Sequence, residues 1–397
     1  MLVKIEDQYD TNTVIETIIH NDTQSYENCG YFEGYTYKRF IFLFVFAVVS
    51  LSGVIANFLL MAVFRRTFVK SIYLFSLATC DCLLCLTYLL LFGVDAAIVY
   101  FKSKLLFFLY HRYIIPVYYL SKVVQFAMPF ILIMITFERY LWTCTESKRK
   151  RFSDLFDVRG RLMTIITILI VSIVLRCPIF LVTYIAYFPQ CNDYFRRESV
   201  VTEEWAAEGI YHFYDFHFIT VIQMLIPFIL LFFLNLTIVK RLIAEKKENM
   251  CPTFRGPGGE GKKVSCIQGN LPENYVLLQV ATDVIKGSLV HKSSRTKRSQ
   301  LRNAIYTMLT IVFSYLVCNG VHLFLTILER FSPSLLYSAE DRNISSTFYI
   351  IISDFVSIAY MVSSAIRIII YCKCNMTLRS EIWEYLKGNK QEPQDNS

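Results

Sequence analysis

The sequence predicts an all-α membrane protein: a bundle of seven transmembrane helices, with a short amphipathic helix after the last span. Composition gives the first indication, because 55% of the 397 residues are hydrophobic and only 18% are charged, whereas soluble domains carry about a quarter charged residues. Length gives the second, because seven apolar segments can cross about 30 Å of hydrocarbon, which takes roughly 20 helical residues. The third is that none of the seven alternates like a strand of a membrane barrel.

Each apolar segment is expected to be a helix, since a helix satisfies its own backbone hydrogen bonds in lipid. The predicted spans are 40–64, 72–94, 114–137, 162–188, 216–239, 305–327 and 347–371. The N-terminal segment 1–39 starts polar and acidic, without the pattern of a cleavable signal peptide. The transmembrane domain 40–371 contains a flexible loop at 243–296, with the Pro- and Gly-rich stretch "CPTFRGPGGEGKK", and a tail follows at 372–397.

Basic residues in the connections predict the orientation. The connections after spans one, three and five, together with the tail, hold 27 Lys and Arg, whereas the N-terminal segment and the other connections hold 10. Cytoplasmic loops carry the excess of Lys and Arg. We therefore expect a multi-pass protein of the plasma membrane, with its N-terminus extracellular and its C-terminus cytoplasmic.

Two kinds of modification are expected on the extracellular side. The sequons at Asn21 and Asn343 fall there and are candidate glycosylation sites. Cys29 and Cys191 are the two cysteines that lie clearly outside. One disulfide between them would tie the N-terminal segment to the 189–215 loop, but the two thiols can equally be unpaired, because spacing does not give their distance.

Short motifs occur in a fixed order along the predicted helices. They are Gly53 and Asn57 in "GVIANFLLMAVF", Asp81 at the end of "SLATCD", the triplet Glu138-Arg139-Tyr140, and Pro227 in "MLIPFILLFFLN". Together they resemble the rhodopsin-like (class A) G-protein-coupled receptors over nearly the whole chain. The patches "LVCN", "SSAIRIIIY" and "ERYLWTC" look more narrowly like the FMRFamide-type neuropeptide receptors of invertebrates.

The resemblance implies a switch at the cytoplasmic end of the third helix. Arg139 would contact a heterotrimeric G protein when helix six moves outward, with Glu138 as its restraint and Tyr140 and Tyr371 beside it. The simpler interpretation is a charged pair that anchors the helix at the membrane surface. This chain departs from the family where helix six reads Cys-Asn-Gly-Val at 318–321 and where helix seven has an arginine, Arg367, in place of the usual Asn.

Polar residues inside the bundle form a second expected site. They are Asn57, Asp81, Ser363, Ser364 and Arg367. In the family the aspartate of helix two binds sodium, but here Met128 replaces a hydroxyl partner on helix three. We hypothesise that Arg367 is the counter-ion of Asp81, since an ionised carboxylate inside a membrane is costly without a partner. The alternative is a protonated Asp81, with Arg367 reaching toward the cytoplasm.

The extracellular half of the bundle is expected to bind the ligand. Acidic residues dominate the outer loops and would attract a cationic ligand, although such loops can also be merely solvated. An amidated peptide that ends in Arg-Phe fits; the alternative is a chemosensory receptor for a small environmental molecule. The candidate ligand-binding residues are Asp95, Tyr118, Tyr119, Lys122, Gln125, His322, Asp354 and Tyr360.

The cytoplasmic tail is expected to meet membrane lipid through its amphipathic helix. Cys372 and Cys374 are candidates for palmitoylation and equally for free thiols. The sequence has no metal-ligand cluster, no phosphate-binding glycine loop and no nucleophile motif. We therefore expect no enzyme activity, no cofactor, no metal and no nucleic-acid partner. A transporter or channel is the structural rival, but the internal repeats common in transporters are missing from the sequence.

Overall fold

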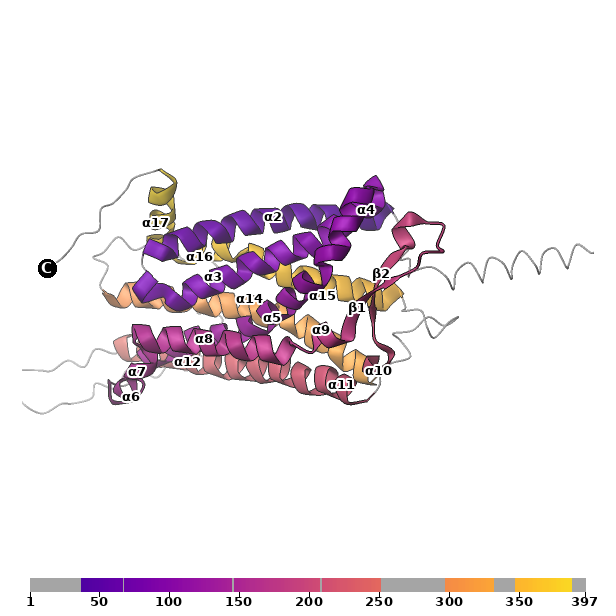
Figure 1. Cartoon of the computed structure of the whole chain (residues 1–397). Helices are drawn as coiled ribbons and strands as arrows, with labels where there is room; N and C mark the ends of the chain where they lie inside the picture. Colours follow the sequence, from indigo (N-terminus) through magenta and orange to yellow (C-terminus); the bar gives the residue numbers. More distant parts are fainter. Residues whose placement is uncertain are drawn as a thin grey trace, which may run out of the picture.

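Seven helices that are long and apolar enough to cross a membrane form one bundle in the computed structural model (Figure 1). The structure describes residues 37–66, 68–144, 146–207, 209–250, 297–331 and 347–387. The spans are Phe40–Arg66, Ile72–Ile98, Lys104–Trp142, Val158–Val182, Phe213–Ala244, Ile305–Leu328 and Asp354–Cys374. The predicted seven-helix fold is thereby confirmed.

Several spans are built from more than one helical element. The first is α2 (Tyr37–Arg66); the second is α3 (Phe68–Tyr88), the π-helical turn η1 (Leu89–Gly93) and α4 (Val94–Phe101); the third is α5 (Lys104–Trp142). The fourth is α8 (Val158–Arg176) with α9 (Ile179–Val182). The fifth consists of the π-helical η3 (Phe213–Ile219) and η4 (Val221–Leu225) and of α12 (Ile226–Met250), and the short α11 (Ile210–His212) precedes it. The sixth is α14 (Lys297–Phe331), and the seventh is α15 (Thr347–Ala365) with α16 (Arg367–Cys374).

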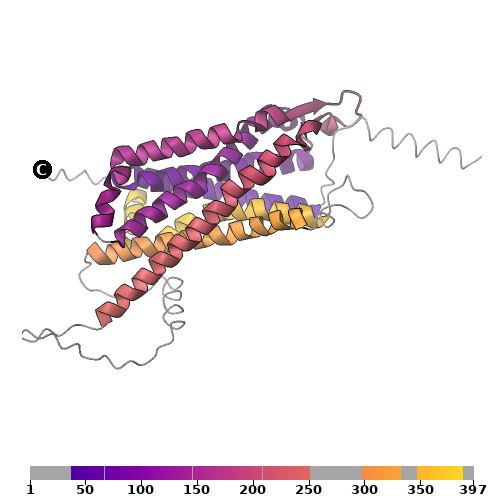
Figure 2. The same ribbon diagram turned by 90° about the horizontal axis from the view of Figure 1, so that it is seen from below.

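Shorter elements connect the spans. They are α6 (Glu146–Arg151), α7 (Ser153–Phe156), the strands β1 (Thr183–Tyr187) and β2 (Glu198–Thr202), the 3-10 turn η2 (Tyr194–Arg196), α10 (Glu204–Ala207) and the terminal α17 (Met376–Leu386). Figure 2 shows α12 running obliquely across the other helices. It continues to Met250, so the loop predicted from 243 begins later.

The third helix starts earlier than the sequence predicts. Residues 101–113 were expected to be a loop, but α5 begins at Lys104. Only a tight turn remains before it, with Lys102 in the left-handed region at φ 48°. Ser103 caps the new helix, because its side chain accepts a hydrogen bond from the Leu106 amide at 3.4 Å. Lys104 and Arg112 interrupt the apolar residues at the start of α5, so hydropathy alone does not identify this part as helical.

The fourth span ends earlier than predicted. Helical structure stops at Val182, and the next residues form β1, which pairs antiparallel with β2 in the register Thr183–Thr202. Pro178 interrupts the helix, because proline donates no backbone hydrogen bond. The sequence after it, "TYIAY", is rich in β-forming residues. The expected helix to 188 and loop at 189–215 are therefore a helix, a hairpin and short helices.

The interior of the bundle is apolar, as in a soluble protein, but its outer surface is apolar as well. Fully buried apolar side chains such as Leu77, Ile131 and Val312 fill the interior. Large apolar side chains also stay exposed on the outside, for example Ile55 at 65% and Phe58 at 66%. Water would make such a surface costly, whereas hydrocarbon does not.

Gly53 is required where α2 approaches α15 and α3, and this gives a first prediction. A Cβ at Gly53 would come within 2.8 Å of both the Ala365 Cβ and the Cys85 Sγ. We expect Gly53→Ala to destabilise the bundle by about 1–3 kcal/mol, because the added methyl group overpacks the interface. Gly320→Ala in α14 is the matched control, because nothing lies within 4 Å of its added Cβ. Thermal unfolding of the two purified variants checks this, and equal stability of the two would contradict it.

Candidate functional site

A buried ion pair joins the second and seventh helices. Arg367 Nη1 donates a hydrogen bond to Asp81 Oδ2, and the two side chains are 1% and 0% exposed. Arg367 Nη2 also lies 4.0 Å from the Met128 sulfur on α5. The contact that the sequence analysis raised as a hypothesis is thus present in the structure. Two opposite charges here balance each other away from water.

The local backbone brings Arg367 to this position. The seventh span is interrupted for one residue at Ile366, between the last residue of α15 and the first of α16. Ile366 has ψ −6°, outside the usual helical value, yet its amide still donates to the Val362 carbonyl at 2.9 Å. The span therefore stays continuous while its second half starts at the arginine.

Asn57 connects the first helix to the same cluster. Its Nδ2 donates to the Gly53 carbonyl at 2.9 Å and to the Ser364 carbonyl at 3.1 Å. Ser363 and Ser364 are buried as well, at 5% and 0% exposure. All five polar residues predicted for the interior are therefore buried, and they come from α2, α3, α15 and α16.

At the Arg139 end of the bundle, the carboxylate of Glu138 bonds to a residue that the sequence analysis did not name. Glu138 Oε1 accepts a hydrogen bond from Arg161 Nη2 of α8 at 2.6 Å, and the side chains are 9% and 14% exposed. Arg139 instead has its guanidinium 4.0 Å over the Trp142 ring. Charges on both arginines act on Glu138. Glu138 is therefore bonded to Arg161, and the restraint of Arg139 by Glu138 stays a prediction.

Tyr140 and Tyr371 lie in different surroundings. The Tyr140 ring is 4.8 Å from the Arg241 guanidinium of α12, and its hydroxyl is 3.4 Å from Arg241 Nη2. Arg241 also donates to the Thr143 carbonyl at 3.1 Å. These contacts join the fifth helix to the end of α5. Tyr371 is buried at 3% exposure and packs edge-on against Phe64.

In the other half of the bundle, an arginine of α8 binds two residues of the fifth span. Arg176 is 8% exposed. Its Nη1 donates to Asp215 Oδ1 at 2.9 Å, and its Nη2 donates to Gln223 Oε1. The guanidinium also lies 5.8 Å from the centre of the Phe126 ring. These contacts place Arg176 inside the bundle.

A hydrogen-bonded chain links α14 to α15 in the same half. Tyr360 Oη donates to Asn319 Oδ1 at 2.5 Å, and His322 Nδ1 lies 2.9 Å from Tyr360 Oη. Lys122 has its ammonium 5.2 Å from the centre of the Tyr118 ring. These contacts bring together four of the predicted ligand-binding residues in two pairs.

The remaining predicted ligand-binding residues lie elsewhere in this half. Gln125 donates to Ser121 Oγ on its own helix at 3.1 Å. Tyr119 turns to the fourth span, where its hydroxyl donates to the Ile173 carbonyl at 2.9 Å. Asp95 and Asp354 are half-buried on α4 and α15, and each acts electrostatically on a tyrosine of the second or third span. The acidic candidates Asp95 and Asp354 therefore have different neighbours from the basic candidates Lys122 and His322.

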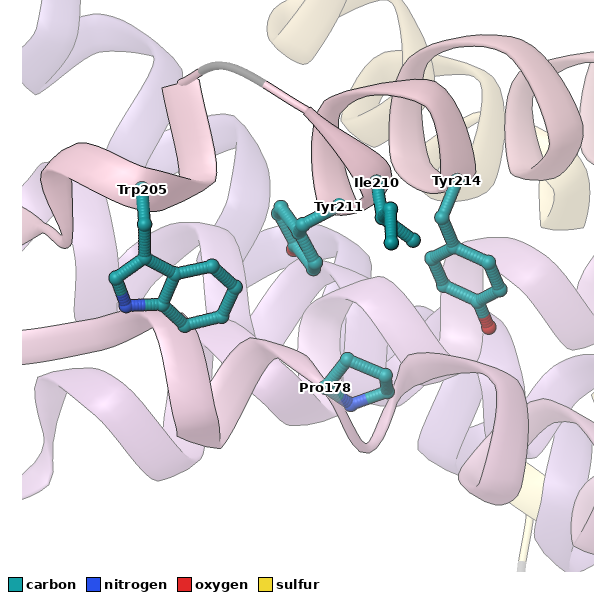
Figure 3. A pocket seen from close by; sticks show the side chains of 5 residues that line it. All are labelled: Pro178, Trp205, Ile210, Tyr211 and Tyr214. Atoms are coloured by element: carbon teal, nitrogen blue, oxygen red, sulfur yellow. The ribbon is translucent and has the colours of Figure 1, made fainter.

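An apolar pocket opens between the fourth and fifth spans at this end (Figure 3). Its volume is about 480 Å³, and its lining consists of Pro178, Trp205, Ile210, Tyr211 and Tyr214. Tyr214 is fixed by a hydrogen bond from its hydroxyl to the Leu175 carbonyl at 2.7 Å. Burial, together with the charge of nearby Asp215, raises the pKa of Tyr211 to about 12. That phenol therefore stays protonated at physiological pH.

Several predicted modification sites lie outside the described residues. Cys191 is disulfide-bonded, but its predicted partner Cys29 lies outside the described residues, as do Asn21 and Asn343. Cys372 and Cys374 are free and half-buried. Among the described residues, no group of three or more His, Cys, Asp or Glu side chains could hold a metal ion.

The predicted amphipathic helix corresponds to α17. Asn375 caps it by accepting a hydrogen bond from the Leu378 amide at 3.2 Å. Leu378 and Ile382 are buried against the bundle, and Trp383 is 60% exposed. Burial, together with the neighbouring Glu384, raises the pKa of Glu381 above its ordinary value. The helix therefore has one face on the bundle and another available to lipid.

Seven membrane-length helices packed around a buried ion pair define a membrane protein of the seven-helix class. Residues 52–371 match the family model described as 7 transmembrane receptor (rhodopsin family). The chain belongs to this family. Members of this family are receptors, and membership supports signalling through heterotrimeric G proteins. No curated protein matches the chain.

Proposed function

We propose that the chain is a plasma-membrane receptor whose N-terminus is extracellular, that it binds an amidated peptide of the RFamide type, and that it activates a heterotrimeric G protein through Arg139. The observation that carries the G-protein part is the arrangement at the Arg139 end. Glu138 bonds to Arg161, while Arg139 stacks on Trp142. The guanidinium is thus held by a weak aromatic contact, which a partner protein can replace.

The peptide part of the proposal rests on charge and aromatic character. Asp95 and Asp354 supply carboxylates on α4 and α15 for the guanidinium of the peptide, and a bidentate pair of this kind is strong. Tyr118 and Tyr360 supply ring surfaces for its phenylalanine. The excess of basic residues in the predicted cytoplasmic connections supports the orientation.

A cell assay tests the proposed function. The full chain is expressed, its display at the cell surface is measured, and a panel of amidated Arg-Phe peptides is applied while second messengers are recorded. We expect a response to at least one peptide, and a loss of about tenfold or more in potency when the arginine of the peptide is replaced by the uncharged citrulline, because a charge-assisted contact is lost.

Two variants sharpen the assay. Arg139→Gln should remain at the cell surface and lose signalling, whereas Arg149→Gln, at an exposed site in α6, should keep both. Response to a small environmental molecule, with silence toward every peptide, would overturn the peptide part alone. Full signalling by Arg139→Gln would overturn the role of Arg139.

A further inference from the structure

Three basic side chains from three helices meet in the half of the bundle that carries the pocket. We call Lys122 of α5, Arg176 of α8 and His322 of α14 the basic cluster. The charges of Lys122 and Arg176 both act on His322. The Lys122 ammonium is 5.2 Å from the centre of the Tyr118 ring, and the Tyr118 hydroxyl acts electrostatically on Arg176. The three basic groups therefore lie within electrostatic reach of one another.

Among the described residues, the carboxylates that bond to the basic cluster do not balance its positive charge. Asp215 bonds to Arg176 at 2.9 Å and neutralises that one cation. Within the part of the chain that the structure describes, no carboxylate pairs with Lys122, whose ammonium faces an aromatic ring instead. Charged groups inside membrane bundles are normally paired with one another or line a path for a charged substrate. One positive charge is thus left without a partner.

Two members of the basic cluster also have unused hydrogen-bonding capacity. Arg176 Nε is buried and has no hydrogen-bond partner among the residues that the structure describes. At His322, the direction of the hydrogen bonds decides the tautomer. Tyr360 uses its proton for Asn319 Oδ1, so it can only accept from His322, and Nδ1 must carry the proton of that 2.9 Å contact. His322 Nε2 is then left as the unprotonated ring nitrogen, which can accept a hydrogen bond from a ligand.

We propose that the basic cluster binds an anionic group of the ligand, most simply a carboxylate, with Lys122 as its principal counter-charge. The inference rests on the proposed function, because it adds a second contact for the same ligand. A peptide ligand would then carry an acidic side chain close to its Arg-Phe end. Its cationic group would meet Asp95 and Asp354, and its anionic group would meet Lys122. The site would select ligands that carry both charges.

A binding measurement without any peptide tests the anionic site first. The purified full chain is heated with acetate or succinate and, separately, with acetamide or succinamide, at equal sodium chloride. We expect at least one carboxylate to raise the unfolding temperature by about 2 °C or more above its amide, since a ligand that binds the folded state stabilises it. The difference should disappear in Lys122→Gln.

Lys104→Gln is the matched control for this substitution. Lys104 lies on the same helix, and its ammonium is also 5.2 Å from a tyrosine ring centre, that of Tyr194. It belongs to a different part of the bundle, so Lys104→Gln should keep the difference between carboxylate and amide. Equal shifts with acids and amides in the unmodified chain would overturn the inference, as would an unchanged difference in Lys122→Gln.

Matched peptides separate this inference from the proposed function. Two amidated Arg-Phe peptides differ only in a glutamate or a glutamine before the arginine. We expect the glutamate peptide to be about tenfold more potent on the unmodified receptor and on Lys104→Gln, and equal to the other on Lys122→Gln. Equal potency everywhere would overturn the inference and leave the peptide function intact. Carboxylate binding with silence toward both peptides would overturn the peptide function and leave the inference intact.

Discussion

Asp81→Asn and Arg367→Gln are each expected to remove most of the folded receptor from the cell surface. Each variant leaves one charge of a pair that is 0–1% exposed without its partner. Removing one member of a buried ion pair typically costs about 3–5 kcal/mol, because the remaining charge stays desolvated and uncompensated. Such a loss is a large fraction of the stability of a whole protein.

The double variant distinguishes a true pair from two independent residues. When both charges are absent, neither is left unpaired, so the double variant should lose less than the sum of the single losses. Surface display and thermal unfolding of the three variants measure this. The exposed pair Glu146–Arg149, at 3.4 Å and 54% to 81% exposure, is the control, and its neutralisation should cost less than about 1 kcal/mol. Strictly additive losses at Asp81 and Arg367 would contradict the pairing.

Glu138→Gln and Arg161→Gln are expected to change signalling in opposite directions. Glu138 bonds to Arg161 at 2.6 Å, and Arg139 is its other charged neighbour. Without Arg161, the carboxylate is available only to Arg139, so ligand-dependent signalling should fall. Without the carboxylate, Arg139 loses its restraint, so ligand-independent signalling should rise. Both variants should also lose about 2–4 kcal/mol of stability, because each leaves a largely buried charge without its partner.

Second-messenger output, divided by the number of receptors at the surface, measures the two effects. The division matters because lower stability alone would reduce the output of both variants. Arg149→Gln again serves as the control for loss of a basic residue near this end. If both variants lost signalling equally after the division, the pair would be a structural anchor of α5 on α8 and would have no part in activation.

The number and order of the helices could be predicted because hydrophobicity alone carries that information. All seven spans follow from runs of apolar residues, and α17 follows from helical spacing with a polar cap. The ends were predicted less well. The start of α5 was hidden by Lys104 and Arg112, although Ser103 before Lys104 was a usable capping signal. The hairpin of β1 and β2 depends on pairing between residues 11 to 19 positions apart, which the composition of either segment alone does not predict.

Among the polar contacts, too, some could be predicted from the sequence and others could not. The contact of Asp81 with Arg367 was accessible from sequence, because two charges in apolar helices need each other. Arg161 was not, because a basic residue at the start of a span is ordinary and nothing local shows which helix it faces. The grouping of Lys122 with Arg176 and His322 likewise depends on how three helices are rotated, and periodicity in one chain fixes the faces of a helix only where they are strongly amphipathic.

Asp81 and Arg367 lie 286 residues apart in the chain, and their charges are expected to be kept or lost together in evolution. A mutation that neutralises either Asp81 or Arg367 alone is expected to disable the molecule, whereas neutralising both should restore it in part. Orthologous genes should therefore hold either the acid and the base together or neither of them, and intermediates with only one should be rare. A census of such pairs among related genomes would show whether the acid and the base change together.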